Sequence, residues 1–130
     1  MLINTVCIVG GSGFVGQRLA NRLSAEGLKI LIPTRNRERH RGNLILLPEV
    51  QLIHANVHDE QQLCGLFETC DAVINLSCIL NERSGLNQGF WQVHVDLTTK
   101  IINAIRRTGV KRLLHMSALN ASVNGSSQYL

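Results

Sequence analysis

The sequence predicts an α/β fold, a Rossmann-type parallel sheet of about five strands with helices on both faces. Short apolar segments alternate with longer segments of helical periodicity along the 130 residues. A glycine-rich segment, residues 10–16, stands between the first apolar segment and the first helical one. Because parallel strands need crossover connections, this alternation indicates a doubly wound sheet.

The first strand is predicted at Leu2–Val9 and the first helix at Phe14–Glu26. The strand lacks the positively charged start of a signal peptide and runs directly into the glycines. The helix carries apolar residues at every fourth position, and Gly27 is expected to end it. Its expected buried stripe is Val15, Leu19 and Leu23.

The second strand is predicted at Leu28–Ile32, with Pro33 ending it. The charges that follow predict a loop, which becomes a short helix near Leu44–Leu47. A third strand is expected at Gln51–His54.

Asp59 is predicted to cap the next helix, because Gln62 follows it by three residues. A fourth strand is expected at Ala72–Leu76. The apolar face of the intervening helix is expected to comprise Leu63, Leu66 and Phe67.

The longest helix is predicted at Gln88–Thr108, closed by Gly109, and a fifth strand at Arg112–Met116. The expected buried stripe of this helix is Trp91, Val95, Ile101, Ile102 and Ile105.

The composition indicates one globular domain, with 45% hydrophobic and 17% charged residues. The formal charge of +4 is concentrated in the arginines of residues 35–41, which favours a local anion over a nucleic-acid surface. No apolar stretch is long enough to predict a membrane span. The four cysteines show neither C-x-x-C nor zinc spacing, so we expect reduced thiols in a cytoplasmic protein and no metal site.

The glycine segment has the chemistry of a pyrophosphate site. A tight turn is needed at Gly10 or Gly11, the phosphates approach the backbone near Gly13, and helix packs on strand at Gly16. The helix start then offers free N–H groups to the phosphates. An ordinary glycine-rich turn is the alternative. The expected cofactor contacts are Gly10, Gly11, Ser12, Gly13, Phe14, Val15 and Gly16.

The end of the second strand favours NADP(H) over NAD(H). NAD-specific sites place an acidic residue about 20 residues past the glycines, to hold the ribose 2′-OH. Residues 33–37 contain no acid, and Arg35 could instead clamp a 2′-phosphate, with Arg37 as a second candidate. A solvated charged loop is the alternative, and NAD(H) remains an alternative cofactor.

The glycine segment satisfies both G-x-G-x-x-G and G-x-x-G-x-x-G, and the second pattern resembles the extended and atypical short-chain dehydrogenases/reductases, which include NAD-dependent epimerases and dehydratases. Residues 56–59 resemble the family's adenine-contacting segment D-x-x-D, with Asn56 replacing the first acid and Val57 beside it. Residues 72–76 resemble the strand under the nicotinamide ribose, which implies contacts from Leu76 and Ser77. Residues 109–117 resemble the family's fifth strand.

Residues 117–121 and 126–130 resemble one branch of this family, the nucleotide-binding accessory subunit of respiratory complex I and its bacterial relatives. The resemblance places Tyr129 at the catalytic tyrosine, with Ser117 next to the usual Ser/Thr position, which is Ala118, and near the cofactor. The partner lysine would fall one helical turn later, beyond Leu130, and His94 replaces the active-site Asn. We therefore expect residues 1–130 to be the N-terminal NAD(P)-binding part of a longer protein, without its later sheet portion and substrate domain, and inactive by themselves.

The resemblance implies a reductase, epimerase or dehydratase that acts on an unidentified small molecule. The alternative is a non-catalytic subunit that holds NADP(H) in an assembly. Nucleic acid is not an expected partner, whereas an assembly partner or a second copy of the chain is a candidate. The expected location is the cytoplasm or the periphery of a membrane complex.

Overall fold

The computed structural model describes residues 3–10, 14–35, 49–77 and 87–116. The strands form one parallel sheet in the order β3-β2-β1-β4-β5. This confirms the predicted fold class, a Rossmann-like sheet with helical crossovers. The elements are β1 (Thr5–Val9), α1 (Phe14–Ala25), β2 (Lys29–Thr34), β3 (Val50–His54), α3 (Glu60–Phe67), β4 (Ala72–Asn75), α4 (Asn87–Thr108) and β5 (Arg112–His115).

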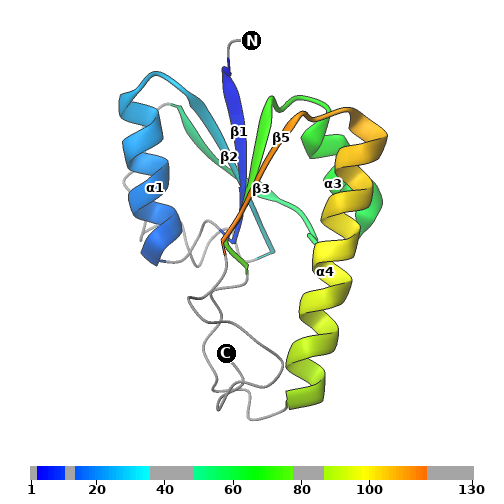
Figure 1. Ribbon diagram of the computed structural model, residues 1–130. Coiled ribbons are helices and arrows are strands. Elements are labelled where there is room, and N and C mark those ends of the chain that lie inside the picture. The colour runs from blue at the N-terminus through cyan, green and yellow to red at the C-terminus, as the bar shows by residue number, and fades with distance from the viewer. Residues whose placement is uncertain (1–2, 11–13, 36–48, 78–86, 117–130) are drawn as a thin grey trace.

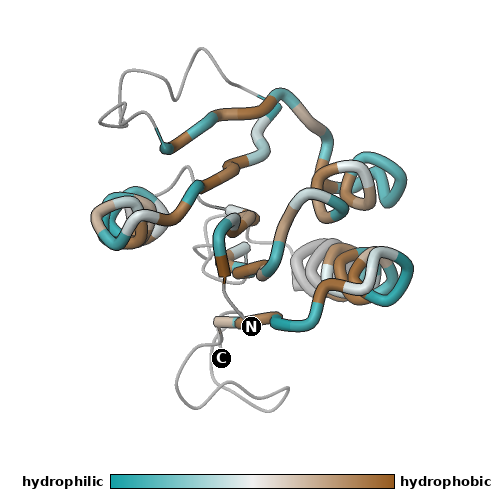
Figure 2. Tube along the Cα trace, turned by 90° about the horizontal axis from the view of Figure 1, so that it is seen from above, coloured by the Kyte–Doolittle hydropathy of each residue, from teal (hydrophilic) through white to brown (hydrophobic). Residues whose placement is uncertain are grey.

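Helices cover both faces of the sheet, with α1 on one side and α3 and α4 on the other (Figure 1). Because side chains alternate along a strand, β1 sends Val6 and Ile8 to the α1 side and Cys7 and Val9 to the other. Hydrophobic segments accordingly follow the sheet between the two helical layers in Figure 2. Each face therefore has its own hydrophobic core.

Cysteines contribute to the core on the α3–α4 side. Cys7 has no exposed surface and Cys70 is buried, whereas Cys64 on α3 is half-buried. A hydrogen bond with the Cys70 thiol, together with burial, raises the pKa of Cys7 well above its ordinary value. Cys7 therefore serves as a small apolar side chain in the packing.

Two helices end at glycines, as predicted. Gly27 has a φ of 88°, and the N–H groups of Gly27 and Leu28 donate to the carbonyls of Ser24 and Leu23. Gly109 has a φ of 78° and donates to the carbonyl of Ile105. These left-handed residues satisfy carbonyls that the last helical turn leaves unpaired.

Asp59 caps α3, also as predicted. Its Oδ1 accepts from the N–H of Gln61 at 3.0 Å, and its Oδ2 accepts from Nε2 of Gln62 at 3.0 Å. The Gln62 Oε1 in turn accepts from the N–H of Asn56 at 2.8 Å. Gln62 therefore ties the β3–α3 loop to the start of the helix, in a variant of the expected capping box.

Pro33 does not end β2, which continues to Thr34. The N–H groups of Ile30 and Lys29 donate to the β3 side and the β1 side respectively. By this alternation the missing N–H of Pro33 falls on the β1 side, where the pairing has already ended at Leu31. The proline therefore interrupts no bond of the sheet ladder.

The buried faces of two helices differ from the predicted stripes. On α1, Val15 is 38% exposed, while Ala20 is fully buried. On α4, Val95 is 57% exposed, and Leu97, Ile101 and Ala104 are the buried residues among residues 95–108. The predicted α4 stripe is thus correct at Ile101 and wrong at Val95. The Trp91 side chain lies outside the described residues, as does the predicted helix near Leu44–Leu47.

None of the helices in the described ranges is both long enough and apolar enough to cross a membrane.

Candidate functional site

The candidate site lies at the carboxyl edge of the sheet, the lower edge in Figure 1. The central strand β1 is followed by β2 on one side and has β4 on its other side. The chain order therefore reverses at β1, and ligands of open α/β sheets bind at such a switch point.

Gly10 makes the turn that follows β1 and has a φ of 80°. A Cβ on this residue would lie 2.9 Å from the backbone nitrogen of Ser77 and 3.0 Å from the carbonyl carbon of Leu76. Both the left-handed conformation and the close backbone approach require glycine. Gly10 thus brings the β1–α1 turn directly against the end of β4.

The end of β4 is held by Asn75, which is only 1% exposed. Its Oδ1 accepts from the backbone N–H of Ser77 at 3.0 Å and also from the Ser77 hydroxyl. Its Nδ2 lies 3.1 Å from Nδ1 of His115, the last residue of β5. Leu76 is buried in the core on the α1 side, and its N–H donates to the carbonyl of Val9 at 2.8 Å.

Positive charge gathers at the other side of the switch point. Arg35 is exposed directly after β2. Burial lowers the pKa of His58, and the charges of Lys100 and Arg35 lower it further, against an opposing effect of Asp96. His58 is therefore neutral near pH 7, and the surrounding charge suits an anion.

The β3–α3 loop forms a fixed turn. The Oδ1 of Asn56 accepts from the backbone N–H of His58 at 3.0 Å, so the turn itself uses the oxygen of this carboxamide. Because this bond uses the oxygen, the Nδ2 of Asn56 is the atom of the carboxamide that could contact a ligand. Val57 is half-buried and packs against the core on the α3–α4 side.

The remaining predicted site residues fall into two groups. Phe14, Val15 and Gly16 form the first turn of α1, where Gly16 is buried and Val15 exposed. Outside the described residues lie Gly11, Ser12, Gly13, Arg37, Ser117 and Tyr129.

Asn75 and His115 were not predicted as site residues. Each is a polar residue that closes an apolar strand at its carboxyl end, and this position is the sequence signal that could have found them. Their contact itself requires knowing that β4 and β5 are neighbours.

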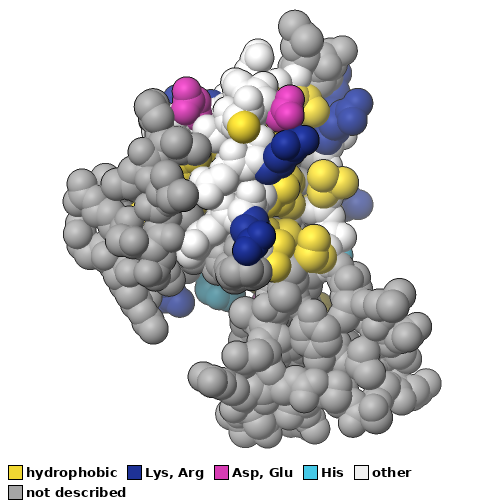
Figure 3. Space-filling view, turned by 90° about the vertical axis from the view of Figure 1, so that its left-hand side faces the viewer, with side chains coloured by type: hydrophobic (Ala, Val, Ile, Leu, Met, Phe, Trp, Pro, Cys, Tyr) yellow, Lys and Arg dark blue, Asp and Glu magenta, His cyan; other side chains and the backbone are white. Residues whose placement is uncertain are grey.

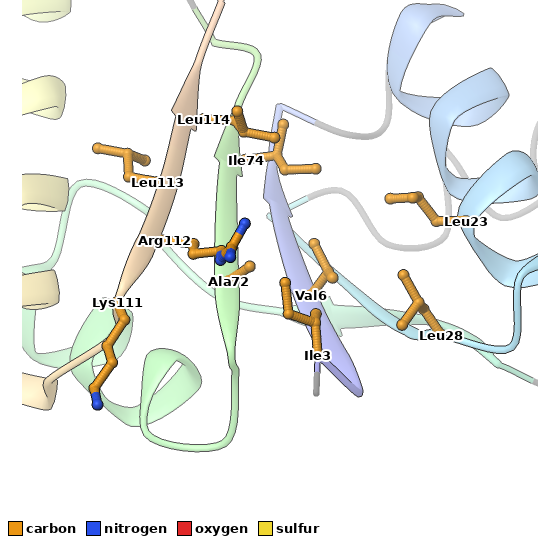
Figure 4. Close-up of a pocket in the computed structure, with 10 residues that line it drawn as sticks. All are labelled: Ile3, Val6, Leu23, Leu28, Ala72, Ile74, Lys111, Arg112, Leu113 and Leu114. Carbon is orange, nitrogen blue, oxygen red and sulfur yellow. The ribbon is translucent and has the colours of Figure 1, made fainter. Parts of the chain in front are cut away.

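A hollow of about 440 Å³ on the α1 face lies away from this edge. It is lined by Val6, Leu23, Ile74, Leu114 and neighbouring side chains, and Lys111 points away from its centre (Figure 4). Figure 3 shows hydrophobic side chains exposed beside Lys and Arg on this side of the molecule. The hollow lacks contact with Gly10 or Arg35 and is not the candidate site. Among the described residues no group of metal-binding side chains lies together.

Proteins from several organisms resemble this chain. The mitochondrial 40 kDa subunit of NADH-ubiquinone oxidoreductase from Neurospora crassa is 27% identical over 97% of the chain and 34% of its own length. Subunit 9 of the NADH dehydrogenase [ubiquinone] 1 alpha subcomplex from Rattus norvegicus is 31% identical over 95% of the chain and 33% of its own length. Sterol-4-alpha-carboxylate 3-dehydrogenase from Dictyostelium discoideum is 26% identical over 78% of the chain and 30% of its own length. The chain thus spans about a third of the length of these relatives.

Solved structures share the fold. An epimerase from Methanothermobacter thermautotrophicus superposes with a TM-score of 0.76 at 18% identity, covering 97% of this chain and 43% of that one. The Bordetella bronchiseptica enzyme WbmF, in complex with NAD+, gives a TM-score of 0.74 at 23% identity, covering 97% and 41%.

The family model of the NAD dependent epimerase/dehydratase family matches residues 6–129, nearly the whole chain. This match agrees with the parallel sheet, the glycine turn after β1 and the site at the switch point. The chain therefore belongs to the NAD dependent epimerase/dehydratase family, of which it forms a Rossmann-type nucleotide-binding domain.

Proposed function

We propose that this domain binds NADP(H) in preference to NAD(H), and that the full-length protein is a reductase, epimerase or dehydratase. The observation that carries the preference is the exposed Arg35 directly after β2, where an acidic residue would hold an unmodified ribose. Lys100 and Arg35 both act on His58, against the opposing charge of Asp96, so two of these three neighbouring charges are positive. A 2′-phosphate is the anion that a dinucleotide would offer there.

The test is calorimetry on the full-length protein with NADPH and NADH. We expect NADPH to bind about 10- to 100-fold more tightly, the worth of one charge-assisted pair. Arg35→Ala should remove most of this difference. Arg106→Ala, which alters an exposed arginine in the last turn of α4, should leave it intact. Equal affinities in the unmutated protein would show that the preference is absent.

The glycine turn and the Asn56 loop are proposed to hold the other parts of the cofactor. The pyrophosphate would lie at the start of α1, contacting residues 10–16, where Gly10 leaves room at the backbone. Asn56 and Val57 would border the adenine, and Leu76 and Ser77 the nicotinamide ribose. In catalysis Tyr129 would be the acid–base group, with Ser117 near it.

We further propose that the sheet continues beyond β5 in the full-length protein and that a substrate domain follows. The relatives are about three times as long as this chain, and β5 pairs within the described sheet only with β4. The hollow of Figure 4 is lined in part by β5, and further chain could pack against it there.

A second candidate is a non-catalytic subunit that holds NADP(H) within an assembly in the cytoplasm or at a membrane complex. The observation in its favour is the similarity to the two NADH dehydrogenase subunits. Incubating the full-length protein with NADPH and a panel of carbonyl compounds separates the candidates. Turnover that Tyr129→Phe abolishes would identify an enzyme, whereas tight binding without turnover would identify the subunit.

A further inference from the structure

The buried carboxamide of Asn75 determines the chemistry of the neighbouring His115. Asn75 is 1% exposed at the carboxyl end of β4, where an unpaired polar atom would be costly. Its oxygen and nitrogen therefore have to face partners of the right kind.

The Ser77 backbone fixes which way the carboxamide points. A backbone N–H can only donate, and that of Ser77 lies 3.0 Å from the inner atom of the Asn75 side chain. That atom has to be the oxygen, Oδ1. The amide nitrogen Nδ2 consequently faces His115, at 3.1 Å from its Nδ1.

The same logic fixes the tautomer of His115. The Nδ2 of Asn75 can only donate, so the Nδ1 of His115 has to accept. In the neutral ring the proton is then on Nε2. His115 is exposed, so its ring offers an N–H donor at the carboxyl edge of β4 and β5.

The position of this donor relative to Arg35 indicates what it would contact. Arg35 follows β2, on one side of β1, while His115 ends β5, on the other side. A dinucleotide at a switch point crosses it with the pyrophosphate at the β1–α1 turn. If Arg35 holds the 2′-phosphate, the nicotinamide half lies over β4 and β5.

We propose that His115 is a binding residue for the nicotinamide half, donating from Nε2 to one of its oxygens, and that Asn75 is the positioning residue that holds His115 in the donating tautomer. Asn75 also accepts a hydrogen bond from the Ser77 backbone, against which Gly10 packs. It therefore holds both His115 and the backbone at the end of β4 in place. This inference rests on the proposed NADP(H)-binding function.

The first test reads the tautomer and needs no ligand. Long-range 1H–15N correlation spectra of the neutral imidazoles of the full-length protein should show the His115 proton on Nε2. In Asn75→Asp, both side-chain oxygens accept, so the proton should move to Nδ1. A wild-type proton on Nδ1, or no change in the variant, would overturn the assignment.

The second test separates the two halves of the cofactor. Calorimetry of the full-length protein compares NADPH with adenosine 2′,5′-bisphosphate, which lacks the nicotinamide half. Asn75→Asp and His115→Phe should each weaken NADPH binding about tenfold, the worth of one hydrogen bond, and change binding of the fragment less than about twofold. Leu114→Ala, next to His115 in β5 but lining the hollow on the α1 face, is the matched control and should change neither.

Because His115 is exposed, His115→Phe carries the test even where the Asp variant fails to fold. Equal weakening of both ligands, or no weakening of NADPH, would overturn this inference and leave the proposed function intact. A wild-type protein that binds neither ligand would instead overturn the proposed function, and this inference with it.

Discussion

Gly10 is constrained both by its left-handed conformation and by a close backbone contact, and other glycines of the chain show the first constraint without the second. Gly10, Gly27 and Gly109 all have φ values near 80° to 90°, in the left-handed region. Only at Gly10, among these three, would an added Cβ meet neighbouring atoms within 4 Å. Its substitution therefore has a steric cost in addition to the conformational one.

Alanine substitutions at these three positions should differ in stability. Gly27→Ala and Gly109→Ala should each lower the free energy of unfolding by about 1–2 kcal/mol, the cost of the left-handed conformation. Gly10→Ala should lower it by about 2 kcal/mol more, because the Ser77 backbone has to move. Urea unfolding of the three variants measures these differences. Equal losses at all three positions would contradict the close approach of Gly10 to the backbone at the end of β4.

At the scale of elements, the sequence predicted well what depends on neighbouring residues. The cap at Asp59 and the end of α1 at Gly27 are local features, and both are correct. The prediction that Pro33 ends the second strand was wrong. A proline interrupts a strand only where a neighbouring strand would accept a hydrogen bond from that position, and β1 no longer pairs with β2 there. The prediction of which side of α4 is buried was partly wrong. Residues 95–105 carry apolar side chains on more than one face of the helix, and packing against α3 and the sheet decides which face is buried.

Two residues two positions apart, on opposite faces of α4, test its orientation. Leu97 is 5% exposed in the core on the α3–α4 side, so Leu97→Ala should cost about 2–5 kcal/mol of unfolding free energy. Val95 is 57% exposed, so Val95→Ala should change stability by less than about 0.5 kcal/mol. Thermal unfolding measures both. A larger loss at Val95 than at Leu97 would show that the predicted stripe was correct after all.

At the scale of the whole molecule, the alternation of elements was enough to predict the sheet, but not the polar contact at its edge. Asn75 and His115 lie 40 residues apart, and only the strand order brings them together. The same strand order leaves apolar side chains at the β5 edge. Leu113, Leu114 and Met116 are 37%, 64% and 41% exposed.

A protein limited to residues 1–130 should self-associate through this edge. Within the described sheet β5 pairs on one side only, and exposed apolar side chains on such a strand favour pairing between molecules. Leu114→Lys should shift sedimentation toward the monomer by placing a charge at the edge. Val95→Lys introduces the same charge at a similarly exposed position on α4 and is the control. If both variants associate like the unmutated protein, the β5 edge is not the contact.

The cysteines are buried to different degrees, so their reactivity can report opening motions in separate regions of the protein. Alkylating reagents react with accessible thiolates, so the labelling rate of each cysteine reports how often its surroundings open. Of the three cysteines in the described residues, half-buried Cys64 should be labelled before Cys70, and Cys7, in the central strand, only when the sheet separates from α3 and α4. By the proposed function, added NADPH should slow labelling of Cys7 in proportion to the stability that binding confers, while Cys64 continues to react at its native rate.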